Sequence, residues 1–156
     1  MHATVRSLIE AAPDPPGEVC VIDIEASLEH FAQNKAIHAD TMLIVVEPYF
    51  RSLESGRRMI GLARQLDPDR LALVANKVRG EDDLAPVREL ATGHGLELAA
   101  AVPYDERLLD AERADSAPLD FDPAAPAVAA IDELARRLVP DRANGAAAGK
   151  GDAEPR

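Results

Sequence analysis

Short, uninterrupted apolar runs recur along the chain, and a polar segment follows each of them. The runs are Val19–Ile22, Met42–Val46, Arg70–Ala75 and, more weakly, Leu96–Val102. Runs of this length are typical of strands that are buried on both faces, as in a parallel sheet. We therefore expect four strands, whose ends are marked by Asp23, Glu47, Asn76 and Pro103.

Between these runs, apolar residues recur every three or four positions, which indicates helices. The expected helices cover 4–12, 52–66, 83–92, a short segment with Asp105 as its N-cap, and a last segment that begins at Asp122 with Pro123 at its first position. In the last helix we expect five residues to be buried: Val128, Ile131, Leu134, Ala135 and Leu138.

Strands that alternate with helices predict an α/β fold. The expected architecture is an incomplete doubly wound, mostly parallel sheet of four strands with flanking helices. We expect one domain over residues 1–139 and a disordered Ala/Gly/Pro-rich tail over 140–156.

Charge and composition narrow the classes of partner. The net charge is −11 and only 3% of the residues are aromatic. These values argue against a nucleic-acid surface, which needs basic or stacking side chains. No apolar run is long enough to cross a membrane, and the single cysteine, Cys20, has no partner for an internal disulfide, so we expect a cytoplasmic protein. Cys20 falls in an expected buried strand, where it would pack rather than react.

Polar residues at the strand ends are the candidates for chemistry, because the carboxyl ends of parallel strands meet at one edge of the sheet. The four ends carry D-I-E-A-S-L-E-H, E-P, N-K and P-Y-D, in chain order. Any strand that leaves a sheet ends in polar residues, so each segment alone is a weak signal. The order of the four segments along the chain is a more specific signal than any one of them.

In this order the segments resemble the C-terminal half of the MinD/ParA-type (SIMIBI) P-loop ATPases. The resemblance is greatest to the accessory ATPases that help to insert nickel into carbon monoxide dehydrogenase. Such proteins carry D-x-E-A-G-x-E-H, then V-x-E-P-x-x-x-S-L-E, then N-K-V, then V-P-Y/F-D-E. The matching segments begin at Asp23, Val45, Asn76 and Val102, and the resemblance covers about residues 3–139.

On the phosphate side, the resemblance implies that Asp23 is the Walker-B acid that holds the Mg²⁺ of MgATP. Glu25, Ser27, Glu29 and His30 would belong to the switch that senses the γ-phosphate. Ser27 stands where the family usually has glycine, and it adopts a positive φ less readily. Glu25, Glu29 and His30 could instead form a metal site, although a switch on a solvated acidic face is the interpretation that we favour.

On the base side, the resemblance implies that Asn76 contacts adenine, because an amide both donates to and accepts from a base edge. Lys77 would lie along the base or brace the loop. Pro103, Tyr104 and Asp105 would line the other side of the adenine pocket. The N-K pair also begins guanine-binding motifs, but the Asp that follows in those motifs is missing here.

The sequence contains no G-x-x-x-x-G-K-[ST] segment. Such a loop supplies the amide cradle and the lysine that bind the phosphates, so we do not expect the chain alone to hydrolyse ATP. In the family, the strand before that loop lies between the strand that ends at Asp23 and the strand of 42–46. We therefore expect a part of a longer or split protein, or a decayed remnant. The alternative is a genuine short domain whose strands close the gap directly.

Three functions are compatible with these features. The first is an incomplete MinD/ParA-like ATPase that forms an ATP-dependent homodimer once an N-terminal half is supplied, and that serves a metalloenzyme client in nickel delivery. The second is a non-catalytic protein-interaction domain that uses the former dimer face around 25–58. The third is a receiver-like module, which fits less well because a receiver needs an acidic pair at the end of its first strand.

Overall fold

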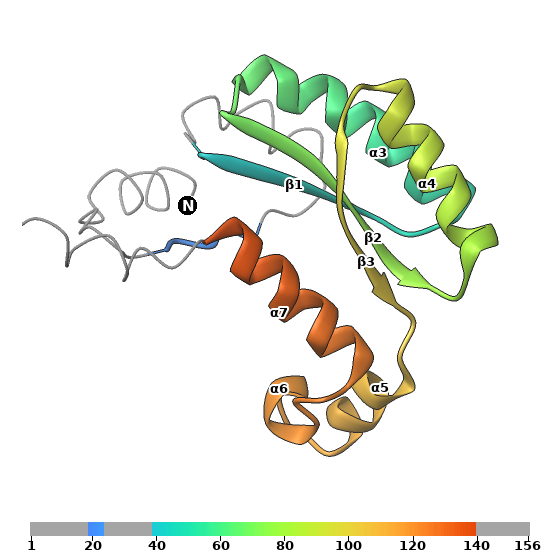
Figure 1. The fold of residues 1–156 in the computed structure, drawn as a ribbon, viewed down its shortest axis with the longest axis vertical. Helices are drawn as coiled ribbons and strands as arrows, with labels where there is room; N and C mark the ends of the chain where they lie inside the picture. The colour runs from blue at the N-terminus through green and yellow to red at the C-terminus, as the bar shows by residue number, and fades with distance from the viewer. Residues whose placement is uncertain (1–18, 24–38, 140–156) are drawn as a thin grey trace, which may run out of the picture.

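The computed structural model describes residues 19–23 and 39–139 (Figure 1). The elements are β1 (Thr41–Val46), α3 (Phe50–Ala63), the 3-10 helix η1 (Arg64–Leu66), β2 (Arg70–Val78), α4 (Glu81–Gly93), β3 (Glu97–Pro103), α5 (Glu106–Arg113), α6 (Pro118–Phe121) and α7 (Pro126–Leu138). Strands and helices alternate as far as β3, which confirms the predicted α/β class. Each observed strand contains or closely follows one of the predicted apolar runs.

The strands form one parallel sheet in the order β1-β2-β3. The ladder between β1 and β2 is regular, from Thr41 opposite Arg70 to Val46 opposite Ala75. The ladder between β2 and β3 shifts register twice, and the second shift lies between Ala75 and Val78. Because the strands are parallel, all three end at the same edge of the sheet.

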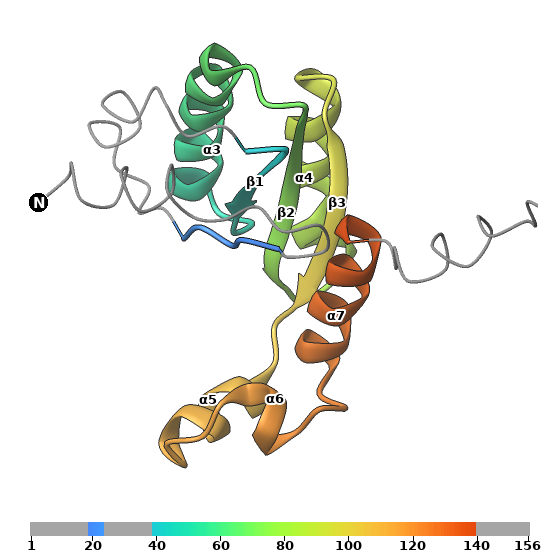
Figure 2. The same ribbon diagram turned by 90° about the vertical axis from the view of Figure 1, so that its left-hand side faces the viewer.

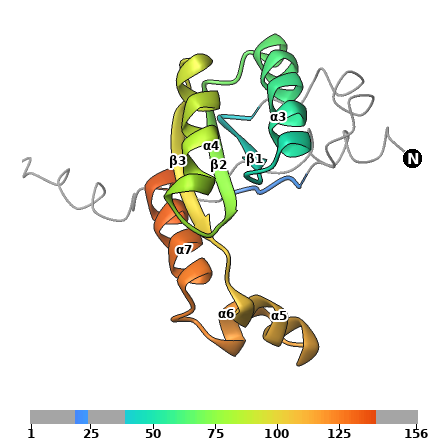
Figure 3. The ribbon, with the colours of Figure 1, turned by 90° about the vertical axis from the view of Figure 1, so that its right-hand side faces the viewer.

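Helices α3 and α4 cover one face of the sheet, and α7 lies on the other (Figures 2 and 3). The core beneath α3 and α4 is built from large apolar side chains, among them Met42, Ile44, Val46, Met59, Ile60, Leu73, Val87 and Leu90. Gly56 allows α3 to approach β1 closely, since a Cβ at that position would lie 2.7 Å from Val46 Cγ1. This face therefore holds the main core.

The α7 face is packed with smaller side chains, chiefly alanines: Ala72, Ala99, Ala100 and Ala127, together with Val74, Val102 and Leu134. α7 packs on β3, while Val45 on β1 is 58% exposed. We predicted strands that are buried on both faces, and for β1 that prediction is wrong on this side. The α5–α6 pair extends away from the sheet beyond the end of β3 (Figure 1).

The predicted first strand is not formed. Residues 19–23 lie outside the sheet, Val21 is 87% exposed, and Cys20 is exposed rather than buried. An apolar run becomes a strand only when a neighbouring strand satisfies its backbone groups. Within the described residues the sheet ends at β1, and the segment has no strand beside it.

The start of the last helix also differs from the prediction. Asp122 follows the short helix α6 instead of capping α7, and α7 begins four residues later at Pro126. Val128 and Leu134 are buried as predicted and Leu138 is half-buried, but Ile131 and Ala135 are exposed. α7 contacts the sheet through a narrower stripe than its apolar positions suggest.

The predicted helix over 4–12 and the predicted tail over 140–156 lie outside the described residues. Across the described part of the chain, no helix combines the length and apolar character that a membrane crossing requires.

Candidate functional site

At the end of β1 the chain turns directly into α3. The backbone N–H of Glu47 donates a hydrogen bond of 2.9 Å to Ser52 Oγ. The N–H of Tyr49 donates to the carbonyl of Glu47 at 2.8 Å. These two bonds hold the backbone of Glu47 at the edge of the sheet, and its side chain is free to reach the next strand.

At the end of β2, Asn76 and Lys77 occupy the second register shift of the ladder. Lys77 has a φ of 58°, in the left-handed region that residues other than glycine seldom adopt. The Asn76 side chain accepts a 3.0 Å hydrogen bond from the Lys77 N–H through Oδ1. The shift therefore places the Asn76 amide and the Lys77 backbone in direct contact.

An ion pair joins these two strand ends. Lys77 Nζ lies 2.9 Å from Glu47 Oε1. The hydrogen bond to Glu47 and the charge of that carboxylate raise the pKa of Lys77 above its usual value of 10.5. Half of the Lys77 side chain is exposed, so the pair is worth less than about 1 kcal/mol. The pair therefore adds little stability, but it links the end of β1 to the end of β2.

The end of β3 is tied to the end of β2. The N–H of Tyr104 donates to the carbonyl of Val78 at 2.9 Å. The guanidinium Cζ of Arg79 lies 4.1 Å from the centre of the Tyr104 ring, which is a cation–π contact. The backbone N–H of Arg79 donates to Asp83 Oδ2 at 2.9 Å. Arg79 is thus held at both its backbone and its side chain.

The carboxylate of Asp105 accepts hydrogen bonds from the first turns of two helices, α5 and α7. Oδ1 accepts from the N–H of Arg107 at 3.0 Å, and Oδ2 accepts from the N–H of Ala127 at 3.1 Å. The first bond caps α5, as predicted, and the second satisfies a donor in the first turn of α7. Arg107 in turn pairs with Asp122 at 3.0 Å. Asp105 therefore has a structural role that the sequence showed only in part.

The predicted base-side residues lie at adjacent strand ends. Pro103 is opposite Val78 in the ladder, and Tyr104 is hydrogen-bonded to the same residue. Asn76 and Lys77 immediately precede Val78 on β2. Glu47 was predicted only as a polar strand end, with no role of its own, although its position directly after an apolar run marks it. No role was predicted for Arg79, and nothing in the sequence indicates its stacking on Tyr104.

The predicted phosphate-side residues are described only at Asp23, whose side chain is exposed. Glu25, Ser27, Glu29 and His30 lie outside the described residues. Over residues 19–23 and 39–139, no group of three or more His, Cys, Asp or Glu side chains could hold a metal ion.

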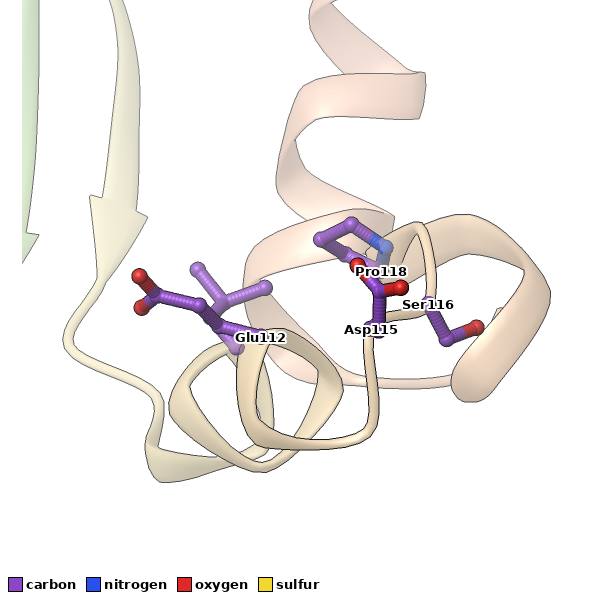
Figure 4. Close-up of a pocket in the computed structure, with 5 residues that line it drawn as sticks. Glu112, Asp115, Ser116 and Pro118 are labelled. Carbon is purple, nitrogen blue, oxygen red and sulfur yellow. The ribbon is translucent and has the colours of Figure 1, made fainter.

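A surface hollow of about 310 Å³ lies elsewhere, where α5 meets the segment that leads to α6 (Figure 4). Its lining residues are Leu108, Glu112, Asp115, Ser116 and Pro118. It contains none of the predicted site residues. Two carboxylates in its wall make it a poor site for phosphate groups.

No protein-family model matches the chain. Among curated proteins, it is 40% identical over 95 residues to an uncharacterized ATP-binding protein of Methanocaldococcus jannaschii, over 61% of this chain and 37% of that protein. It is 32% identical over 123 residues to the carbon monoxide dehydrogenase accessory protein CooC of Rhodospirillum rubrum, over 79% of this chain and 46% of CooC. The chain therefore spans less than half the length of the curated relatives that it matches.

The solved structures that match the chain are also covered over less than half of their length. The MinD cell division protein of Aquifex aeolicus matches with a TM-score of 0.52 and 28% identity, over 64% of this chain and 44% of MinD. The MinC:MinD complex of the same organism gives 0.55 and 26%, over 76% of this chain and 46% of the matched chain. This partial coverage fits the C-terminal half that the motifs indicate. The chain is therefore similar to about half of each of two MinD/ParA-like ATPases, MinD among the solved structures and CooC among the curated proteins.

Proposed function

We propose that this chain supplies the adenine side of an ATP site in a CooC-like member of the family. One observation carries the proposal: Asn76, Lys77 and Tyr104 meet at the carboxyl edge of the parallel sheet, where α/β proteins bind nucleotides. The Asn76 amide offers both a donor and an acceptor to a base edge. The Tyr104 ring is partly exposed at the same edge of the sheet, with the Arg79 guanidinium stacked on one of its faces.

For the phosphate side, we propose that Asp23 holds the Mg²⁺ of bound MgATP. Its exposed carboxylate fits this role, because Mg²⁺ bound with a nucleotide takes one or two protein carboxylates and completes its shell with phosphate oxygens and water. Glu25, Ser27, Glu29 and His30 would form the switch beside the γ-phosphate. When bound, the metal neutralises the charge that develops on the phosphates.

For the whole protein, we propose ATP hydrolysis in the service of a metalloenzyme. The similarity to CooC, whose name marks it as an accessory protein of carbon monoxide dehydrogenase, supports this assignment. The protein would act in the cytoplasm, as an ATP-dependent homodimer or together with an N-terminal half. Nickel would be the cargo of that process and not a resident cofactor of this chain.

Titration with a fluorescent ATP analogue in the presence of Mg²⁺ tests the proposal. We expect saturable binding by the full chain, displacement by unlabelled ATP, and a loss of about tenfold in affinity for Asn76→Ala, since a hydrogen bond to the base is removed. Gln65→Ala also removes an exposed side-chain amide, on η1 before the start of β2, and should bind as the wild type does. Equal affinities for all three proteins would contradict the assignment of Asn76, and no binding to the wild type would contradict the nucleotide site.

A second function, in protein interaction, is favoured by the start of α3. Tyr49 is 53% exposed and Phe50 is 76% exposed, and aromatic side chains are enriched at protein interfaces. Under this alternative, the chain would bind a client protein without nucleotide. Phe50→Ser should then weaken client binding while Asn76→Ala leaves it unchanged, and the opposite result would favour the nucleotide site.

A further inference from the structure

We propose that Glu47 is a positioning residue for base recognition: through its ion pair with Lys77, it fixes the end of β2 so that the Asn76 amide faces the nucleotide. The inference rests on the proposed function of the same edge. It assigns a role to a residue on a neighbouring strand that need not touch the ligand itself.

The first support is the conformation of β2 at its end. Between Ala75 and Val78, two residues of β2 lie opposite one residue of β3, so Asn76 and Lys77 leave the regular ladder. A shift of this kind re-aims side chains at the edge of a sheet. Lys77 takes the left-handed conformation there, with a φ of 58°. A lysine adopts that conformation at a cost, so interactions nearby must favour it.

The second support is the anchoring of Glu47. Its backbone N–H is bound to Ser52 Oγ in the first turn of α3, and its side chain is half-buried, at 29% exposure. The carboxylate therefore projects from a fixed point. The 2.9 Å contact with Lys77 Nζ then restrains a residue on the adjacent strand.

The third support is the direct link from Lys77 to Asn76. The Lys77 N–H, in the peptide unit that joins the two residues, donates to Asn76 Oδ1 at 3.0 Å. A displacement of Lys77 that turns this peptide unit would break the bond and release the Asn76 side chain. The chain of contacts thus runs from Ser52 through Glu47 and Lys77 to the amide group that is proposed to contact the base.

The experiment compares the affinities of four proteins for ATP and for GTP: the wild type, Glu47→Gln, Lys77→Met and the double variant. We expect each single change to lower ATP affinity about threefold, the size typical of an exposed ion pair, and the double change to cost no more than either single one. The affinity for GTP should change less, so the ratio of the two affinities falls. Glu54→Gln is the matched control, because it removes another exposed ion pair, with Arg57, on α3.

Rescue by charge exchange completes the test. Glu47→Lys combined with Lys77→Glu should regain most of the ATP preference that either reversal alone loses. Equal losses for ATP and GTP, additive losses, or an effect no larger than that of Glu54→Gln would overturn the positioning role while leaving the nucleotide site intact. Failure of the wild type to bind either nucleotide would instead overturn the proposed function, and this inference with it.

Discussion

Beneath α3 and α4 the sheet is packed with large apolar side chains, whereas the edge where its strands end carries an ion pair, a half-buried amide and a lysine in the left-handed conformation. The first region is held by burial, which is non-directional and tolerates no polar group without a partner. The second is held by individual directed contacts at half-exposed residues. Substitutions that change stability and substitutions that change ligand binding should therefore be separable in this chain.

The largest expected effect lies in the packed region. Leu73 on β2 is fully buried in the core beneath α3 and α4. Leu73→Ala should lower the free energy of unfolding by about 3 kcal/mol, from lost burial and the cavity left behind. Urea denaturation followed by circular dichroism measures this change. Leu109→Ala, at a side chain that is 41% exposed, should cost less than about 1 kcal/mol; equal losses would mean that the core does not lie where we place it.

A smaller effect is expected where α3 contacts β1. Gly56→Ala would place a methyl group 2.7 Å from Val46 Cγ1, and we expect a loss of about 1–3 kcal/mol from the forced displacement. Gly61 lies on the same helix with open space around its Cα. Gly61→Ala should therefore stabilise the protein by about 0.5–1 kcal/mol through helix propensity. Thermal unfolding of the two variants should move in opposite directions, and a common direction would refute the close approach of α3 to β1.

Asp105 links the two regions, because it belongs to the predicted adenine side and also binds the first turns of two helices. Asp105→Ala removes the N-cap of α5 and the bond to the Ala127 N–H, so the free energy of unfolding should fall by about 1–2 kcal/mol. Asp110→Ala, at an exposed pair within α5, should change it by less than about 0.5 kcal/mol. Amide hydrogen exchange should show faster exchange at the start of α7 in Asp105→Ala only. Unchanged protection there would show that α7 is positioned without this bond.

The smallest effect concerns the ion pair at the edge. Contact with Glu47 raises the pKa of Lys77 in the folded state above the value of 10.5 that it has when unfolded. Its contribution is therefore complete below pH 10.5 and is lost as the pH rises through the folded-state pKa. Because Lys77 is half exposed, we expect less than about 1 kcal/mol. The difference in unfolding free energy between wild type and Lys77→Met should be constant below pH 10.5 and shrink as the pH rises above it, and a difference that grows would contradict the pairing.

The local pattern of apolar and polar residues was enough to predict those elements whose formation does not depend on which neighbour they pack against. The runs that became β1, β2 and β3 are apolar enough to be buried in any compact arrangement, and Asp105 caps α5 by a bond within its own segment. The helix start at Asp122 was wrong because Pro118, Pro123 and Pro126 all offer a helix start and only packing selects among them.

The remaining differences depend on neighbours that the sequence does not identify. Val19–Ile22 has the composition of a strand, but strand formation requires a partner in the ladder. Asn76, Lys77 and Tyr104 lie at adjacent strand ends, as the order of the apolar runs indicated, and their role in binding stays a prediction. The geometry of the site was not predicted, because a left-handed lysine and a contact between Lys77 and Glu47, thirty residues apart, follow only from the register shift at the end of β2.

Nuclear magnetic resonance of the isotopically labelled full chain, titrated with MgATP, tests the central claim most directly. We expect the largest amide shifts at the strand ends, at 47–49, 76–79 and 103–105, with much smaller shifts along α7 and at the hollow beside α6. Shifts centred on Glu112, Asp115 and Ser116, or a spectrum that MgATP leaves unchanged, would contradict the claim that the carboxyl edge of this sheet binds the nucleotide.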